Sequence, residues 1–364
     1  IMWRAVDWDK LVAGGDEESD DDTPALGWNS SSDEFKPLAK YFEEGEDLGR
    51  GRFGAVKMVR LRWAGRQFAM KAVRATEREA RIRLAREEIR VHSLLTPHPN
   101  LTQLFFSWAS GRSTMLLFEA CEESLEEHVL ALRRRGMRVK DLAGTARRVG
   151  RDVGEAVCFL HGKGLVHRDI KPENILRSKG LLKLADLGSA GPVENKEATY
   201  ASHAFKAPEA LRESPPIVDY RILDVFALGT SVYDLLFACP DPYGIHELVE
   251  EGKEGGKENK EAFIDGLVHW RKREKVLDPT LRDFMDAALS PSPTTRLQMR
   301  AVVDRLVYDP PTPPLEYPVF SAQEQKTRLR IAAAYSEEKV EEGSIVPYPP
   351  YPTVIQLVAA NIDA

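Results

Sequence analysis

The sequence predicts an α+β fold, with strands gathered in its first third and helices in the remainder. Residues 48–56 have the pattern of a strand, a glycine-rich turn and a second strand, and residues 67–73 form an apolar strand interrupted by one lysine. Residues 76–95 are rich in Glu, Arg, Ala and Leu, which favour helix. A further short apolar strand at residues 114–121 precedes a capping box at residues 124–127, which starts the next helix.

The glycine-rich turn follows the spacing Gly-x-Gly-x-x-Gly, formed by Gly49, Gly51 and Gly54. Glycine lets a backbone come close to phosphate oxygens because it has no Cβ. The spacing alone is weak evidence, since dinucleotide-binding folds use it too, but those folds require a helix directly after it. Residues 55–59 favour a strand instead. The sequence therefore predicts a phosphate-binding loop between two strands.

Lys71 interrupts the second apolar strand and shares a face with Ala69, because residues two apart in a strand point the same way. A lone lysine in such a strand usually lies at an edge or extends to water, and this segment alone favours that interpretation. The distance from the glycine-rich turn favours a functional role instead.

The helix expected at residues 76–95 has signals at both ends. Residues 76–79 form a capping box, and Pro97 lies just beyond the last helical residue. Two glutamates, Glu87 and Glu88, stand side by side within this helix. At least one of them must be a solvated helix charge.

Residues 166–177, Val-His-Arg-Asp-Ile-Lys-Pro-Glu-Asn-Ile-Leu-Arg, place a carboxylate, an ammonium and an amide at short offsets. This stretch resembles the catalytic loop of eukaryotic protein kinases. The resemblance implies that Asp169 accepts the proton of the substrate hydroxyl and that Asn174 holds a magnesium ion. Lys171 is similar to the lysine of serine/threonine kinases that steadies the transferring phosphoryl group.

The resemblance extends over most of the chain and implies ATP and Mg²⁺ as cofactors. Lys71 is then the lysine that binds the α- and β-phosphates and pairs with a glutamate of the following helix. Counting forward to the His-Pro-Asn at residues 98–100 favours Glu88 as that glutamate. Asp186, in Asp-Leu-Gly where the family has Asp-Phe-Gly, is implied to coordinate magnesium together with Asn174.

The expected strand at residues 114–121 resembles the kinase hinge. Phe118 is implied to close the back of the adenine pocket, and backbone groups of Glu119 and Cys121 to bind the adenine edge. The full set of ATP-binding residues that the resemblance implies is Leu48, Gly49, Gly51, Gly54, Val56, Ala69, Lys71, Phe118, Glu119, Cys121 and Leu176.

Further motifs follow in the order that the family requires. Residues 175–185 read as a small hairpin, and Ala-Pro-Glu at residues 207–209 resembles the end of an activation segment. Arg296 is similar to the distant arginine that pairs with the glutamate of that segment. Residues 224–229 match the start of the large helix that anchors the second lobe.

The resemblance implies a two-lobed protein-kinase-like fold, with a small β-rich N-lobe that contains one main helix and a larger, mostly helical C-lobe. The kinase domain is expected at residues 44–308, with the N-lobe at 44–121 and the C-lobe at 122–308. Acidic, serine-rich residues 1–43 are expected to be disordered, and residues 309–364 form a Pro-rich tail with a candidate helix.

Composition narrows the classes of partner. The formal net charge of −6 gives no broad electrostatic reason to expect nucleic acid, and the basic run at residues 133–135 is expected at a solvated helix end. Three scattered cysteines argue against a disulfide scaffold or a zinc site. No membrane span is expected. We expect protein substrates and an intracellular location, cytoplasmic or nuclear.

The sequence leaves three alternative functions to compare with a serine/threonine protein kinase. Residues 88–92, residues 106–109 and the Asp-Leu-Gly variant are similar to Wee-type kinases, whereas Arg168 and Ala-Pro-Glu depart from that group. A pseudokinase, which acts by binding partners, would normally lack one of the motif residues, and all are present. A small-molecule kinase would lack the Ala-Pro-Glu segment. A serine/threonine protein kinase is therefore the favoured function, with its regulators unidentified.

Overall fold

The structure is a computed structural model, and it describes residues 42–51, 54–62, 65–74, 79–110, 113–194, 205–211, 219–238 and 277–306. The acidic N-terminal segment up to residue 41 and the Pro-rich tail lie outside these residues. The chain divides into two compact units. Unit 1 contains Ile1–His98, Thr102–Ala120 and the C-terminal end of the chain, and unit 2 contains Pro99–Leu101 and Cys121–Leu315. Each is described by itself.

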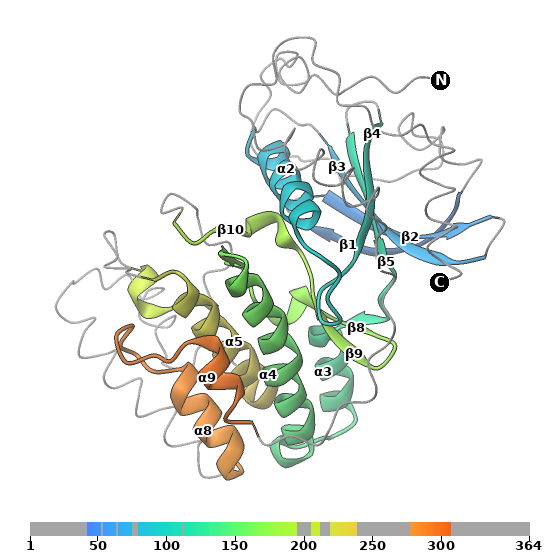
Figure 1. The fold of residues 1–364 in the computed structure, drawn as a ribbon. Helices are drawn as coiled ribbons and strands as arrows, with labels where there is room; N and C mark the ends of the chain where they lie inside the picture. Colours follow the sequence, from blue (N-terminus) through green and yellow to red (C-terminus); the bar gives the residue numbers. More distant parts are fainter. Residues whose placement is uncertain are drawn as a thin grey trace, which may run out of the picture. The chain divides into compact units, whose positions relative to one another are not determined.

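Unit 1 is built on a five-stranded antiparallel sheet with the strand order β1-β2-β3-β5-β4 (Figure 1). The strands that pair in this order are β1 (Phe42–Gly51), β2 (Gly54–Leu61), β3 (Gln67–Arg74), β5 (Ser113–Glu119) and β4 (Leu104–Ser110). Hairpins join β1 to β2 and β4 to β5, as their short connections require.

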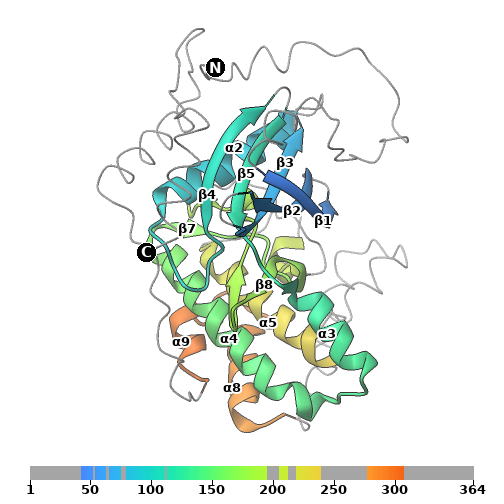
Figure 2. The ribbon, with the colours of Figure 1, turned by 90° about the vertical axis from the view of Figure 1, so that its right-hand side faces the viewer.

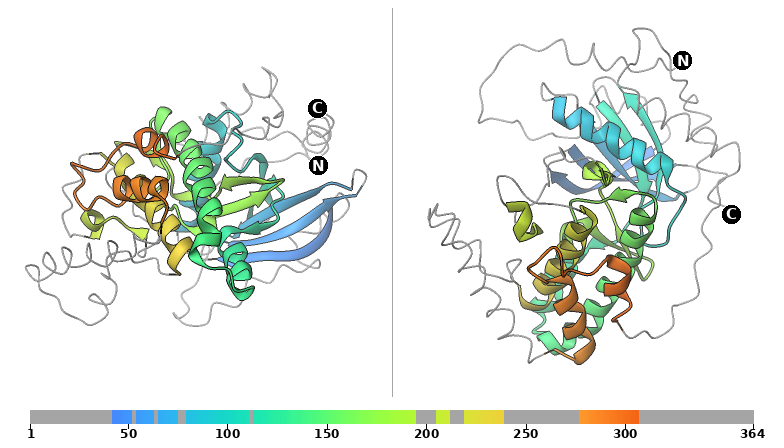
Figure 3. Two further views of the ribbon diagram at one scale, coloured as in Figure 1. Left: turned by 90° about the horizontal axis from the view of Figure 1, so that it is seen from below. Right: turned by 60° about the vertical axis from the view of Figure 1, so that its left-hand side comes forward.

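Helix α2 (Glu79–Leu94) lies across one face of this sheet (Figure 3, right). Its residues Ala85 and Ile89, one helical turn apart, share a buried cluster with Val73, Leu104, Leu116 and Phe118 from the strands. The expected β-rich N-terminal region with one main helix is confirmed. The helix and β3 therefore face each other through this cluster. Lys71 of β3 and Glu88 of α2 lie at the border of the cluster, within reach of each other.

Unit 2 is mostly helical, as expected. Its long helices are α3 (Leu125–Arg134), α4 (Val139–Gly162) and α5 (Arg221–Phe237), followed by α8 (Pro279–Ala288) and the short α9 (Met299–Val303). Helix α4 packs against α5, α8 and α9 (Figure 2). Nearly every side chain of α5 is buried, so this helix forms the centre of the unit.

Two glycines allow helix α4 to approach its neighbours closely. A Cβ at Gly154 would overlap Val303 Cγ2 of α9, and a Cβ at Gly150 would lie 2.8 Å from Leu306 Cδ1. Gly144, on the same helix, differs, because a Cβ there would meet no described atom within 4 Å. The absence of side chains at Gly150 and Gly154 therefore sets the spacing of these helices.

Short strands of unit 2 carry the loops of the site. Strands β6 (Glu123–Ser124), β8 (Ile175–Ser178) and β9 (Leu181–Leu184) form one sheet, and β7 (Leu165–Val166) pairs with β10 (Gly191–Pro192). The turn of the β8–β9 hairpin has positive φ at both Lys179 and Gly180, which matches the twist of the strands it joins. The hairpin predicted at residues 175–185 is thus present.

The basic run at residues 133–135 is not simply a solvated helix end. Arg133 donates hydrogen bonds to the backbone oxygens of Asp234 (2.8 Å) and Leu235 (2.7 Å) in the last turn of α5. Carbonyls in the last turn of a helix have no partner within the helix, and the negative end of the helix dipole attracts a cation. Arg133 therefore fixes the C-terminus of α5, whereas Arg134 and Arg135 are exposed.

Candidate active site

The predicted phosphate-binding turn lies between β1 and β2, as expected. Gly51 pairs with Gly54 at the end of the two strands, and Gly49 pairs with Val56. The turn residues 52 and 53 lie outside the described part of the chain. A Cβ at Gly49 would meet no described atom within 4 Å, so the backbone here borders open space. Leu48 beside it is exposed, at 36% of its full surface.

One face of the sheet carries the other ATP-binding candidates of unit 1. Val56 pairs with Lys71 across the β2–β3 ladder, so their side chains share a face. Ala69 lies two residues before Lys71 on the same face and pairs with Phe118 of β5. Helix α2 covers this face, because Ala69 and Phe118 pack with its buried residues.

Lys71 meets Glu88 at the border of that cluster. The distance from Lys71 Nζ to Glu88 Oε2 is 2.8 Å, and the two side chains are 12% and 2% exposed. Glu87 does not compete for the lysine, because it forms an ion pair with Arg90 one turn along the helix. The structure thus pairs Lys71 with the glutamate that the spacing favoured.

The end of β5 places the hinge candidates of unit 1. Phe118 is buried, and its ring lies 5.5 Å from the ring of His92 of α2. The backbone N–H of Glu119 donates to the Gln103 carbonyl at 3.0 Å, while the Glu119 side chain accepts from the Gln103 N–H at 2.8 Å. Adenine contacts by Glu119 would therefore use its carbonyl oxygen. Cys121 belongs to unit 2, forms no disulfide and is partly exposed.

In unit 2, the loop after β7 is anchored on a buried carboxylate of α5. Asp224 accepts hydrogen bonds from the backbone N–H groups of His167 (2.8 Å) and Arg168 (2.9 Å), and from His161 Nε2 (2.9 Å). Burial alone would raise the pKa of Asp224, but the hydrogen bonds and charges of His161 and His167 outweigh it and hold that pKa below its ordinary value. Arg168 has a φ of 70°, a conformation that these bonds stabilise.

The loop presents Asp169 beside an ammonium and an amide. Asn174 Nδ2 donates to Asp169 Oδ2 at 3.0 Å and to the Asp169 backbone oxygen at 2.8 Å. Lys171 Nζ lies 3.2 Å from the same Oδ2, and the Asp169 side chain is only 2% exposed. Asp169, Lys171 and Asn174 are therefore brought together, as the sequence predicted.

Asp186 follows a residue that is tied to this loop. The Ala185 backbone N–H donates to the Asn174 carbonyl at 2.8 Å, and His167 Nε2 donates to the Ala185 carbonyl at 3.1 Å. Asp186 then has a left-handed backbone with φ 60° and begins a short 3-10 helix, in which Leu187 is fully buried. Leu176, the remaining ATP-binding candidate of unit 2, lies on β8 and pairs with Lys183 of β9.

The donor set suits magnesium held jointly with a nucleotide. Among the described residues there is no group of three or more His, Cys, Asp or Glu side chains placed to hold a metal. Mg²⁺ is typically bound by one or two protein oxygens together with phosphates and water. Because Asn174 Nδ2 donates to Asp169, the amide oxygen of Asn174 is turned away from that residue, and with the Asp186 carboxylate it would provide oxygen donors of this kind.

A buried ion pair fixes the segment that follows the site. Arg296 donates to both carboxylate oxygens of Glu209, at 2.5 and 3.1 Å, and its guanidinium carbon lies 4.8 Å from the centre of the Phe226 ring. The two side chains are almost completely buried. Such bidentate geometry positions the Ala-Pro-Glu segment against α5, as its sequence spacing suggested.

Sequence reasoning missed two elements of this arrangement. Asp224 was noted as the start of a helix but not as the acceptor that holds the loop, and His161 was not singled out. Their partners lie 56 to 63 residues away in sequence. Neither residue has a local pattern that would indicate these bonds.

Comparisons with known proteins agree with this geometry. Residues 42–307 match the family model described as "Protein kinase domain". A Wee1-like protein kinase of Oryza sativa subsp. japonica is 28% identical over 246 residues, which is 64% of this chain and 45% of that protein. A human cAMP-dependent protein kinase catalytic subunit, PRKX, is 30% identical over 281 residues, covering 73% of this chain and 74% of that protein.

The similarities do not favour one kinase group. Calcium-dependent protein kinase 20 of Oryza sativa subsp. japonica is 27% identical over 74% of the chain, much as the Wee1-like and cAMP-dependent relatives are. The chain spans less than half of the length of several of these relatives. In the part of the chain that the structure describes, no helix combines the length and the apolarity needed to span a membrane.

Proposed function

This chain belongs to the protein kinase family, and from that premise we propose that it transfers the γ-phosphoryl group of ATP to serine and threonine side chains of proteins. The observation that carries the proposal is the cluster of Asp169, Lys171 and Asn174, in which Lys171 Nζ lies 3.2 Å from Asp169 Oδ2. A lysine two residues after the aspartate is typical of serine/threonine kinases, and here it lies where it would meet a phosphoryl group on its way to a hydroxyl.

Each residue has a separate task in this proposal. Asp169 orients the substrate hydroxyl and takes up its proton, and Lys171 stabilises negative charge on the transferring group. In unit 1, Lys71, held by Glu88, binds the α- and β-phosphates, and the backbone around Gly49 and Gly51 lies along them. Magnesium, when bound by Asn174 and Asp186, neutralises charge on the phosphates.

Hydrogen bonds already present in unit 2 support the proposed role of Asp169. Asn174 Nδ2 and Lys171 Nζ both approach its Oδ2 atom, which fixes the carboxylate before any substrate arrives. A base that is fixed in this way needs little reorganisation when the proton moves. The low exposure of the side chain also limits competition from water.

The test is a transfer assay with labelled ATP, a mixture of generic protein substrates and phosphoamino-acid analysis of the products. We expect phosphoserine and phosphothreonine, dependence on magnesium, and loss of both products in Asp169→Asn. The proposal would be wrong if the purified parent chain labelled no substrate. It would also be wrong if the Asp169→Asn variant labelled substrates as well as the parent chain does.

A Wee-like tyrosine or dual-specificity kinase is the second candidate. It is favoured by a relative in Caenorhabditis briggsae, 30% identical over 198 residues, whose name describes a tyrosine- and threonine-specific cdc2-inhibitory kinase. That relative is matched over 28% of its length. Phosphotyrosine as the main product of the same assay would favour this candidate. Nucleotide binding without transfer would instead indicate a pseudokinase-type scaffold.

A further inference from the structure

The loop between α8 and α9 contains two Ser-Pro dipeptides in succession, at residues 290–293. Proline holds the residue before it in an extended conformation. Both serine hydroxyls are bonded to exposed threonines of the same loop. Ser290 Oγ lies 2.7 Å from Thr295 Oγ1, and Ser292 Oγ lies 2.8 Å from Thr294 Oγ1. The two hydroxyls are therefore at the surface of unit 2, in the sequence setting that proline-directed protein kinases recognise.

The backbone of Ser290 also holds the guanidinium of Arg296. Its carbonyl accepts from Arg296 Nε at 3.0 Å and from Arg296 Nη2 at 2.9 Å. The other N–H groups of the guanidinium donate to the Glu209 carboxylate and, at 3.3 Å, to the Ile222 carbonyl. A guanidinium has five N–H donors, and these bonds use each of them. A further anion beside Arg296 must therefore take a donor from a partner that Arg296 already has.

Ser292 differs from Ser290 in what its backbone holds. Its carbonyl accepts from the backbone N–H groups of Thr295 at 3.2 Å and Arg296 at 3.1 Å. Ser292 thus begins a turn and is bonded to the main chain of Arg296, whereas Ser290 is bonded to the guanidinium. A negative charge added to Ser290 is the one that is placed to compete with Glu209.

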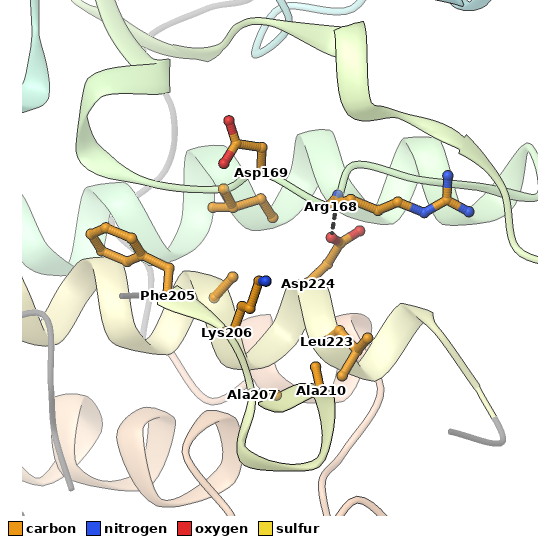
Figure 4. Close-up of a pocket in the computed structure, with 10 residues that line it drawn as sticks. Arg168, Asp169, Phe205, Lys206, Ala207, Ala210, Leu223 and Asp224 are labelled. Atoms are coloured by element: carbon orange, nitrogen blue, oxygen red, sulfur yellow. Dashed lines mark hydrogen bonds between the residues drawn. The ribbon is translucent and has the colours of Figure 1, made fainter. Parts of the chain in front are cut away.

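The pair of Arg296 with Glu209 holds the Ala-Pro-Glu segment of unit 2 in place. Ala207 and Ala210, on either side of this glutamate, lie against α5 and border the same small pocket as Asp169 (Figure 4). Displacement of the segment would therefore reach the surroundings of the proposed base.

We propose that Ser290 is a phosphorylation site for a proline-directed protein kinase, and that its phosphate loosens the Ala-Pro-Glu segment. In this modification the γ-phosphorus of ATP forms a bond to Ser290 Oγ while its bond to the ADP oxygen breaks, and the hydroxyl proton passes to the base of the modifying kinase. The loss of transfer activity that follows rests on the proposed function, whereas the modification itself does not.

The charge of the new group decides the direction of the effect. A phosphoserine carries a charge of about −1.5 to −2 at pH 7, more than the carboxylate of Glu209, and it adds three acceptor oxygens. The phosphate on Ser290 therefore draws N–H donors of Arg296 away from Glu209. Because the Glu209 side chain is only 2% exposed, weaker bonds to Arg296 leave a buried charge less compensated, which favours release of the segment.

The first part of the test asks whether Ser290 is modified. The Asp169→Asn chain, which should transfer little phosphate itself, is incubated with ATP and an active mitogen-activated or cyclin-dependent protein kinase. Mass spectrometry then maps the modified residues, since the chain has further Ser-Pro and Thr-Pro dipeptides such as the one at Thr96. We expect phosphate on Ser290. If neither kinase modifies Ser290, the inference is wrong.

The second part compares the parent chain with and without this treatment, after removal of the added kinase. Hydrogen exchange in residues 205–211 should become faster and transfer of labelled phosphate slower, each by roughly five- to thirtyfold, as expected when the net strength of one or two hydrogen bonds is lost. Ser290→Ala keeps the carbonyl that holds Arg296, so its untreated activity should match the parent and the treatment should not change it. Ser292→Ala is the matched control and should respond as the parent does.

Unchanged hydrogen exchange in residues 205–211 of a chain that is phosphorylated on Ser290 would overturn the inference. A response that persists in Ser290→Ala, or that is lost in Ser292→Ala, would overturn it as well. The comparison of treated with untreated parent chain needs no variant, so it decides the question even if a variant does not fold. If the untreated parent chain transfers no phosphate, the proposed function fails, and hydrogen exchange still tests this inference.

Discussion

The two units hold their candidate site residues in different ways. In unit 1, the ion pair of Lys71 with Glu88 links a strand to a helix. In unit 2, Asp169 lies in a loop whose backbone N–H groups donate to Asp224. The side chain of Asp169 is bound by Asn174 and Lys171. The loop is also bound to the Ala185 carbonyl through His167. A small displacement of α2 would separate the pair in unit 1, whereas several bonds must break together to move Asp169. We conclude that the candidate residues of unit 2 are better preorganised than those of unit 1.

The largest effect is expected for Asp169→Asn. Asparagine keeps an oxygen that accepts from Asn174, so the loop should stay in place while the base is lost. Transfer to protein substrates should fall by about 10²- to 10⁴-fold, the usual contribution of general acid–base catalysis. Single-turnover rates with labelled ATP measure the loss. A marked drop in the thermal midpoint of unfolding would mean that the variant disturbs the loop, and it would contradict the conclusion that unit 2 holds this loop firmly.

The next test removes the anchor itself. Asp224→Ala leaves two buried backbone N–H groups without their acceptor, at a cost of about 1–3 kcal/mol each. We expect the free energy of unfolding in urea to fall by roughly 3 kcal/mol and transfer activity to fall with it. Because the pKa of Asp224 is lowered in the folded state, its contribution is present above the ordinary pKa of Asp and is lost as the pH falls through the lowered value. Full stability of Asp224→Ala at neutral pH would contradict the anchoring role.

Glu88→Gln tests unit 1. It leaves Lys71 in place without its charge partner, and misplacement of a phosphate-binding group by about 1 Å can reduce the rate by about 10²-fold. We expect kcat/KM to fall by about that factor. Glu87→Gln is the matched control, because Glu87 pairs with Arg90 on the helix surface, and it should change kcat/KM less than about twofold. If both variants behave alike, Glu88 does not position Lys71.

The smallest of these effects concerns the far end of α5. Burial raises the pKa of Asp234 to about 6, with the charges of Glu173 and Glu126 adding to it and that of Arg133 opposing it. The folded state then binds a proton more tightly than the unfolded state, so this residue reduces stability as the pH rises from about 4 through 6.

Asp234→Asn should therefore raise the free energy of unfolding by about 1 kcal/mol at pH 7.5, with little change at pH 4.5. Urea unfolding at the two pH values measures the difference. Asp283→Asn, at an exposed position of α8, is the control and should leave the pH dependence unchanged. An Asp234→Asn variant with the pH dependence of the parent would show that the carboxyl is not perturbed.

Local patterns in the sequence were sufficient for much of the fold. Ser124 and Glu127 form the reciprocal capping box that begins α3, because both bonds join residues three apart. The choice of Glu88 over Glu87 came from counting forward to the His-Pro-Asn at residues 98–100 that the resemblance to kinases singled out, and the structure pairs Glu88 with Lys71. The roles of Lys71 and Glu88 in phosphoryl transfer remain predictions until the variants are measured.

Interactions between distant segments were not predictable in the same way. Arg133 is 101 and 102 residues from the backbone oxygens that it binds, and its sequence context suggested only a basic helix end. Such roles depend on tertiary packing, which one sequence does not reveal.

The glycines of α4 have a consequence for genetic screens of this chain. A side chain at Gly154 would overlap Val303, so variants there should score as inactive even though the residue takes no part in chemistry. Such variants should regain function at lower growth temperature, because they fail by misfolding. Asp169 variants should not regain it. Gly144→Ala should instead be tolerated or mildly stabilising, by about 0.5–1 kcal/mol, because its Cβ enters open space on a helix. Temperature dependence therefore separates scaffold positions from chemical ones without purifying any protein.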